Sequence, residues 1–208
     1  SNVLSLYPGY ARALVVRAQV HLANGDRTLA VADLEAARQA EVSPVVTRRL
    51  VDIYERMGDF ANAHAVLRSL LVDRPGDAAA LRALVELCAR HRRWEEMENA
   101  ITEARKYYPR DLYYIIQAVE MWRRTGRVAR AVAVLRNVKK VLTQSAEIDV
   151  LLAQSLLELG QVDEALKLAG ALREHHDLGP SAMAICGRAY LLKNDPARAD
   201  KEFLEAVK

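Results

Sequence analysis

The chain has 208 residues, of which 51% are hydrophobic and 27% charged, and its formal net charge is +3. No run approaches the roughly 18 uninterrupted apolar residues that a membrane-spanning helix needs, and the first ten residues do not resemble a signal peptide. Cys88 and Cys186 are far apart and neither has a second Cys nearby, which disfavours a disulfide framework or a zinc site. Ala, Leu, Arg and Glu dominate and strand signals are poor, so the composition favours an all-α protein.

One phrase recurs along the chain. Residues 24–34 read NGDRTLAVADL, 57–67 read MGDFANAHAVL, 125–135 read TGRVARAVAVL and 159–169 read LGQVDEALKLA. In chain order, the same phase holds a turn residue at spacings of 33 or 34: Gly25, Gly58, Arg92, Gly126, Gly160 and Asn194. Such fixed-period self-similarity is the sequence signature of a repeat architecture.

Three further columns accompany the turn column. Five residues after each turn come Ala30, Ala63, Met97, Ala131, Ala165 and Ala199, and four residues further come Leu34, Leu67, Ile101, Leu135, Ala169 and Phe203. Four residues before each turn come His21, Tyr54, Cys88, Trp122, Leu156 and Tyr190. Gly or Asn provides the left-handed conformation that ends a helix, and Asp26 or Asp59 can cap the next one. Small Ala allows two antiparallel helices to approach closely, and the larger columns fill the groove between them.

This helix-turn-helix pattern resembles the tetratricopeptide repeat (TPR) family, whose signature places an aromatic residue before the turn, Ala after it, then an aromatic or aliphatic residue, and finally Pro. Pro8, Pro75 and Pro109 close three of the units. The resemblance implies an all-α, right-handed superhelical solenoid of antiparallel helix pairs. We expect a single solenoid over 11–208, with six repeats at 11–43, 44–77, 78–111, 112–145, 146–179 and 180–208.

The resemblance also bears on the ends and on the irregular units. Residues 1–10 are expected to form the end of a preceding repeat helix, and the chain is expected to be a fragment of a longer array. Arg92 and Met97 depart from the small-residue columns, so the third repeat should have a tighter or distorted turn. Pro180 should begin a helix, where Pro is tolerated. Adjacent His175 and His176 are expected to point in different directions on a helix, as an exposed feature between repeats rather than a metal site.

The family generally binds peptides or partner proteins in the concave groove lined by the first helix of each pair. By this resemblance and by helical phase, the candidate partner-binding residues are Arg48, Asp52, Arg82, Glu86, Tyr113, Gln117, Glu120, Arg123 and Arg124. Side chains four residues apart share a helical face, so Arg48, Asp52 and Arg56 are expected to form one charge ladder. Arg82, Glu86 and Arg90 should form another. Such ladders either stabilise exposed helices or contact a partner, and the sequence leaves both interpretations open.

Aromatic residues gather in the third and fourth repeats. Trp94, Tyr107 and Trp122 are expected in the core. Tyr108, Tyr113 and Tyr114 cannot all be buried on one helical face, so at least one should be exposed beside Arg123 and Arg124. Tyr and Arg are enriched in interface hot spots. Residues 90–140 hold 13 Lys or Arg and six acids, a net charge of +7 that could attract an acidic partner.

We therefore expect a non-catalytic scaffold that binds a protein or peptide segment, without a catalytic site, metal or cofactor. The first alternative, from family analogy, is a structural assembly module of a bacterial envelope, secretion or exopolysaccharide export system. The second is an RNA-binding helical repeat, which the acids interleaved in the ladders disfavour. Self-association through uncapped repeat ends is a further option. A soluble protein of the bacterial cytoplasm or periplasm, without membrane insertion, is expected.

Overall fold

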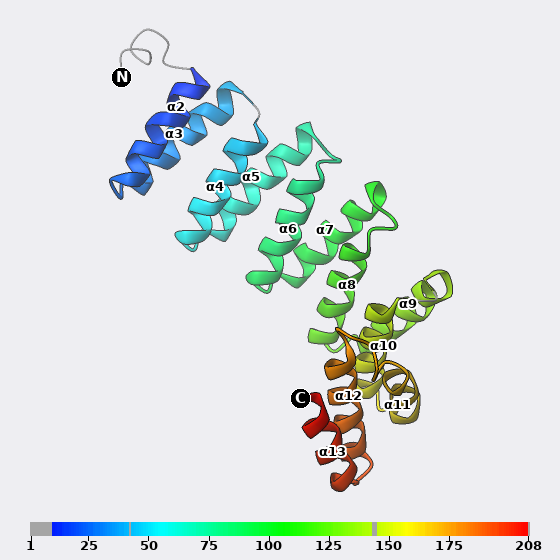
Figure 1. The fold of residues 1–208 in the computed structure, drawn as a ribbon. Coiled ribbons are helices and arrows are strands. Elements are labelled where there is room, and N and C mark those ends of the chain that lie inside the picture. The colour runs from blue at the N-terminus through cyan, green and yellow to red at the C-terminus, as the bar shows by residue number, and fades with distance from the viewer. Residues whose placement is uncertain (1–9, 42, 143–144, 208) are drawn as a thin grey trace. The chain divides into compact units, whose positions relative to one another are not determined.

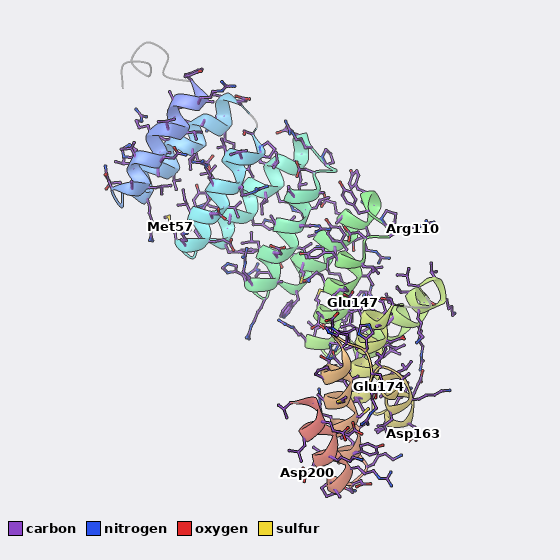
Figure 2. All side chains as sticks on the ribbon, in the orientation of Figure 1. Met57, Arg110, Glu147, Asp163, Glu174 and Asp200 are labelled. Carbon is purple, nitrogen blue, oxygen red and sulfur yellow. The ribbon has the colours of Figure 1, made fainter. Side chains whose placement is uncertain are left out.

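The computed structural model describes residues 10–41, 43–142 and 145–207 (Figure 1). Within these ranges the regular secondary structure is helical throughout and contains no strand. The helices are α2 (Ala11–Ala23), α3 (Arg27–Ala40), α4 (Pro44–Arg56), α5 (Phe60–Asp73), α6 (Ala78–Arg90), α7 (Trp94–Tyr107), α8 (Leu112–Arg124), α9 (Val128–Val141), α10 (Ala146–Glu158), α11 (Val162–Gly170), α12 (Gly179–Leu192) and α13 (Pro196–Ala206). The predicted all-α class is confirmed.

The recurring turn residues adopt the left-handed backbone conformation that their phase predicts. Gly25, Gly58, Gly126 and Gly160 have φ of 86°, 73°, 75° and 79°. Arg92 and Asn194, the two positions without glycine, have φ of 54° and 57°. The turn at Arg92 is therefore built like the others, but on a residue whose Cβ makes this conformation unfavourable.

Short polar side chains begin several of the helices. Asp59 accepts a hydrogen bond from the backbone N–H of Asn62 at 3.1 Å, and Asp77 accepts one from that of Ala80 at 2.9 Å. These bonds satisfy N–H groups that have no partner within the helix. Asp26 precedes α3 in the equivalent position but makes no side-chain cap, so the capping predicted there is wrong. Pro180 lies in the first turn of α12, as expected.

The core follows the sequence columns. The residues of the small column (Ala30, Ala63, Met97, Ala131, Ala165 and Ala199) are at most 2% exposed. Leu34, Leu67, Ile101, Leu135 and Ala169 of the next column are buried, whereas Phe203 is partly exposed. Met97 fits the close approach of two helices despite its size, since an unbranched thioether adapts to irregular space.

The chain divides into two compact units: unit 1 extends to residue 114, unit 2 begins at residue 115, and the boundary falls within α8. In unit 1, consecutive helices from α2 to α7 pack against one another, and in unit 2 consecutive helices from α9 to α13 do so. The division into six repeats and a single domain stays a prediction. The expectation for 1–10 falls on residues outside the described ranges, apart from Tyr10, which is the N-cap residue of α2.

Two expectations for individual side chains are wrong. Tyr107, the last residue of α7, is 48% exposed instead of buried, although part of its ring lies against Gly76. A Cβ on Gly76 would lie 3.2 Å from Cδ1 of Tyr107. His175 and His176 do not lie on a helix: α11 ends at Gly170, and both are exposed in the turns before α12. Of the other two predicted core aromatics, Trp122 is buried and Trp94 half-buried.

Over the residues that the structure describes, no helix is both long and apolar enough to cross a membrane.

Candidate binding groove

A groove of about 330 Å³ runs between α4 and α6 in unit 1. Its floor includes Val51 of α4 and Leu67 and Leu70 of α5, and its α6 wall includes the small residues Ala79 and Ala83. The charged side chains along it are Arg48, Asp52, Glu55, Asp77, Arg82, Glu86 and Arg90. The structure thus brings four of the predicted partner-binding residues together: Arg48, Asp52, Arg82 and Glu86.

A fifth predicted residue, Tyr113, supports one end of this groove. The guanidinium of Arg82 lies 4.7 Å from the centroid of the Tyr113 ring and donates to Oδ2 of Asp111 at 2.8 Å. The hydroxyl of Tyr113 donates to Oε1 of Glu86 at 3.2 Å. Burial, followed by the charge of Glu86, raises the pKa of Tyr113, and the hydrogen bond from Arg82 lowers that of Asp111. Arg82 and Glu86 are therefore held in defined positions by the start of α8.

The partners of the α6 charges lie on neighbouring elements rather than along the helix. Arg82 binds Asp111, which precedes α8, and Nη2 of Arg90 donates to Oε2 of Glu55 on α4 at 2.8 Å. The charged side chains of α6 thus do not pair along the helix, as the expected ladder requires, but with groups on neighbouring elements. Glu55, Arg90 and Asp111 were not predicted as site residues. For Glu55 and Arg90 the sequence does hold a signal, a spacing of 35 residues that is close to one repeat.

Arg48 and Asp52 differ from these paired groups. Both side chains are exposed, and neither makes a hydrogen bond or ion pair with any part of the chain that the structure describes. One cation and one anion on α4 thus remain available at the wall opposite Arg82 and Glu86. A ligand in the groove would not have to break an existing ion pair to reach them.

The other predicted residues belong to unit 2. Gln117 and Glu120 are half-buried and Arg124 is exposed. The Arg123 side chain is only 14% exposed: its Nη2 donates to Oε1 of Glu158 at 2.6 Å and its Nη1 to Oε1 of Glu120 at 2.9 Å. Arg123 therefore serves to join α8 to α10.

Tyr108, Tyr113 and Tyr114 form a cluster within unit 1. Tyr114 is fully buried, and the centroid of its ring lies 6.3 Å from that of Tyr108 and 5.2 Å from that of Tyr113. The Tyr108 hydroxyl donates to the carbonyl oxygen of Gly76 at 2.6 Å. Tyr108 and Tyr113 keep partial exposure, and the cation beside Tyr113 in this unit is Arg82.

Among the described residues, no three His, Cys, Asp or Glu side chains lie together in a group that could hold a metal ion. The thiols of Cys88 and Cys186 are buried, and burial raises the pKa of each to about 11. At neutral pH both are protonated thiols in the helical core.

Two family models match this chain, both described as tetratricopeptide repeat, over residues 44–87 and 150–208. The first match covers α4 to most of α6, which include both walls of the groove. These matches identify tetratricopeptide repeats in both units of the chain. No curated protein sequence matches the chain.

Several solved structures have a similar fold, and two of the three compared below are described as TPR proteins. A tetratricopeptide repeat protein from Parabacteroides merdae superposes with a TM-score of 0.71 at 16% identity, over 95% of this chain and 78% of the other. YrrB, described as a TPR protein with an unusual peptide-binding site, gives a TM-score of 0.60 at 14% identity, over 84% and 90% of the two chains. PilF of Pseudomonas aeruginosa gives 0.60 at 15% identity, over 94% and 89%. At these identities the likeness concerns the fold alone, and it supports the predicted helical solenoid.

TPR proteins generally mediate protein–protein interactions and are generally non-catalytic scaffolds.

Proposed function

We propose that this TPR protein binds a peptide segment of a partner protein in the groove between α4 and α6, without catalysing a reaction. The observation that carries the proposal is the pairing pattern of the groove charges. Arg82 and Arg90 are held by Asp111 and Glu55, whereas Arg48 and Asp52 have no partner among the described residues. Fixed charges on one wall and available charges on the other suit a largely pre-formed recognition surface.

The floor of the groove suits the backbone and apolar side chains of such a segment. Val51, Leu67 and Leu70 are buried apolar residues, and Ala79 and Ala83 leave space along α6 because they have only a Cβ. The peptide would place apolar side chains on this floor and charged side chains of both signs toward Arg48 and Asp52. Tyr113 and Arg82 are residue types that dominate interface energies and would act as anchors at one end.

The groove charges nearly balance, so they give no preference for a strongly acidic partner in this unit. Arg48, Arg82 and Arg90 face Asp52, Glu55, Asp77 and Glu86 along its walls. The same balance argues against a phosphate backbone as the ligand, because nucleic-acid binding depends on a surplus of cations. YrrB, described as a TPR protein with an unusual peptide-binding site, is a precedent within the fold.

The test is a peptide selection with a blocked groove as the comparison. Peptides selected from a random library on the wild-type chain would be measured against Ala79→Trp, which places a large ring at an exposed position in the groove. Ala65→Trp adds the same ring at an exposed position on α5 that does not line the groove. We expect binding to fall about tenfold or more in Ala79→Trp and to be unchanged in Ala65→Trp. Selected peptides that bind all three proteins equally would place the site elsewhere.

A further inference from the structure

A second depression, in unit 2, has a different chemistry from the groove. It is an open hollow of about 450 Å³ formed by α9, α10 and α11, and we call it the α9–α11 hollow. Its apolar floor is Leu152 of α10, which is 2% exposed, and Leu168 of α11, which is half-buried. The cations around it are Arg136, Lys139, Lys140 and Lys167.

The early end of α11 accounts for the position of the hollow. α11 has 9 residues, whereas α9 has 14, so α11 is shorter by about 7.5 Å at 1.5 Å per residue. Both helices pack against α10. Leu168 lies in the last turn of α11, and Lys139 and Lys140 lie in the last turn of α9. The hollow thus opens beside the ends of α9 and α11, where a longer α11 would extend.

Two of the four cations are neutralised within the unit. Nη2 of Arg136 donates to Oε2 of Glu164 at 2.6 Å, and Nζ of Lys139 donates to Oδ1 of Asp149. These pairs join α9 to α11 and to α10, respectively. Arg136 and Lys139 are therefore largely committed to holding the walls of the hollow.

The other two cations have no carboxylate partner among the described residues. Nζ of Lys140 donates only to the amide oxygen of Asn137, at 3.4 Å, and Lys167 makes no hydrogen bond or ion pair there. Both side chains are exposed. The rim thus presents two uncompensated ammonium groups around a leucine floor.

We propose that the α9–α11 hollow is a second interaction site, which takes an acidic segment of a partner protein with an apolar side chain between its carboxylates. The apolar side chain would cover Leu152 and Leu168, and the carboxylates would pair with Lys140 and Lys167. Charge complementarity determines this occupant: the rim has four cations and one carboxylate, Glu164, whereas the groove in unit 1 has charges of both signs in near balance. This site is separate from the groove between α4 and α6, and the proposal does not depend on peptide binding in that groove.

An anionic membrane surface fits the hollow less well. Lipid recognition in proteins typically uses clusters of about 4–8 available cations. Here Glu164 and Asp149 already neutralise two of the four, and the leucine floor lies within the hollow rather than on a protruding surface.

The experiment uses the whole chain and a short fluorescein-labelled synthetic peptide in which acidic residues flank two leucines, with binding followed by fluorescence anisotropy. The test variant is Lys140→Glu/Lys167→Glu, which changes two exposed side chains without carboxylate partners and should leave the fold intact. Its matched control is Lys106→Glu/Lys201→Glu, which makes the same change of net charge at two exposed residues outside the hollow. Circular dichroism would verify that both variants retain the wild-type helicity.

We expect the peptide to bind the wild type and the control variant alike, and to bind the test variant about tenfold more weakly or not at all. Replacing the leucines of the peptide by serine should weaken binding to the wild type by a similar factor, and Ala79→Trp in the groove should not alter it. Equal binding by the test and control variants would overturn the proposal, since only net charge would then matter. Failure of the wild type to bind the peptide, or its binding to phosphatidylserine vesicles but not to the peptide, would also overturn it.

Discussion

Arg123 on α8 and Glu158 on α10 are joined in the same way as Glu55 on α4 and Arg90 on α6, with the charges exchanged. Each pair is separated by 35 residues, with a shortest distance of 2.6 Å for the first and 2.8 Å for the second. Arg123 and Glu55 each lie three residues before a left-handed turn residue, and Glu158 and Arg90 two residues before the next. The same two positions of the repeat thus form an ion pair in both places, with Glu and Arg exchanged between them.

The exchanged polarity makes the pair testable by charge reversal. Arg123→Glu would place a third carboxylate beside Glu120 and Glu158, and we expect the free energy of unfolding to fall by about 1–3 kcal/mol. The double variant Arg123→Glu/Glu158→Arg should recover more than half of the loss, because it recreates the Glu55–Arg90 arrangement. Urea unfolding followed by circular dichroism measures both values.

Arg124 provides the control for this reversal. It is exposed and has no ion-pair partner in the described part of the chain, so Arg124→Glu should change the free energy of unfolding by no more than about 0.5 kcal/mol. If Arg123→Glu were equally harmless, the contact between α8 and α10 would have no role in stability. The contrast also separates a structural arginine from one that is available to a partner.

The turn at Arg92 carries conformational strain that glycine would relieve. Arg92 has φ of 54°, a conformation that costs a residue with a Cβ about 1–2 kcal/mol. We expect Arg92→Gly to raise the free energy of unfolding by about 1 kcal/mol. Thermal unfolding followed by circular dichroism is the measurement, and a lowered melting temperature would contradict the prediction.

Gly126 occupies the same left-handed turn position as Arg92 and allows the opposite substitution, from glycine to a residue with a Cβ. Its φ is 75°, and a Cβ built there would meet no atom within 4 Å, so Gly126→Ala would have only a conformational cost. We expect a loss of about 1 kcal/mol. A neutral result for this variant together with a gain for Arg92→Gly would mean that the two turns differ in more than the residue at their centre.

Ala131 tests the close approach of helices in unit 2. It is 0% exposed on α9, so Ala131→Leu should overpack the helix pair and lower the free energy of unfolding by about 1–3 kcal/mol. Ala133→Leu adds the same side chain two residues away at an exposed position and should be neutral within about 0.5 kcal/mol. Chemical denaturation of both variants would measure the difference, and equal stability would contradict the assigned role of the small column.

The features that the sequence predicts best are those that one repeat determines by itself. The left-handed turns follow from Gly and Asn at a fixed phase, and the buried alanines follow from the same period. The partners of Arg82 and Arg90, and the Glu158 partner of Arg123, could not be obtained from spacing along one helix, because these carboxylates come from other elements. Tyr107 was misplaced because it is the last residue of α7, where its ring stays 48% exposed, and the residue pattern does not show where that helix ends.

The binding surfaces show the same contrast between features set by one helix and features that depend on other elements. Helical phase predicted that Arg48 and Asp52 share one face of their helix and that Arg82 and Glu86 share one face of theirs. The resemblance to the repeat family was also needed to predict that these two faces line one groove. The α9–α11 hollow was not predicted, because it depends on where α11 ends. No Pro or capping residue in the sequence indicates that α11 ends at Gly170. The only signal is this glycine itself, which is a weak helix former.

His64 on α5 should make the stability of unit 1 depend on pH. Its Nε2 is buried without a hydrogen-bond partner among the described residues. The centroid of the Phe60 ring lies 5.4 Å from that of His64 and 5.2 Å from that of His91. Burial, followed by the charge of Arg68, lowers the pKa of His64; Glu96 raises it and Arg93 lowers it further.

Because the folded pKa is below the ordinary value of 6.5, the unfolded chain binds the proton first as the pH falls. The contribution of neutral His64 to stability is therefore fully present above pH 6.5 and is lost as the pH falls toward the lowered pKa of the folded protein. We expect His64→Leu to flatten this part of the stability profile, measured by urea unfolding from about pH 8 to about pH 5. His176→Leu, at a side chain that is 96% exposed, is the control and should keep the wild-type slope. A wild-type slope in His64→Leu would assign the pH dependence to other groups.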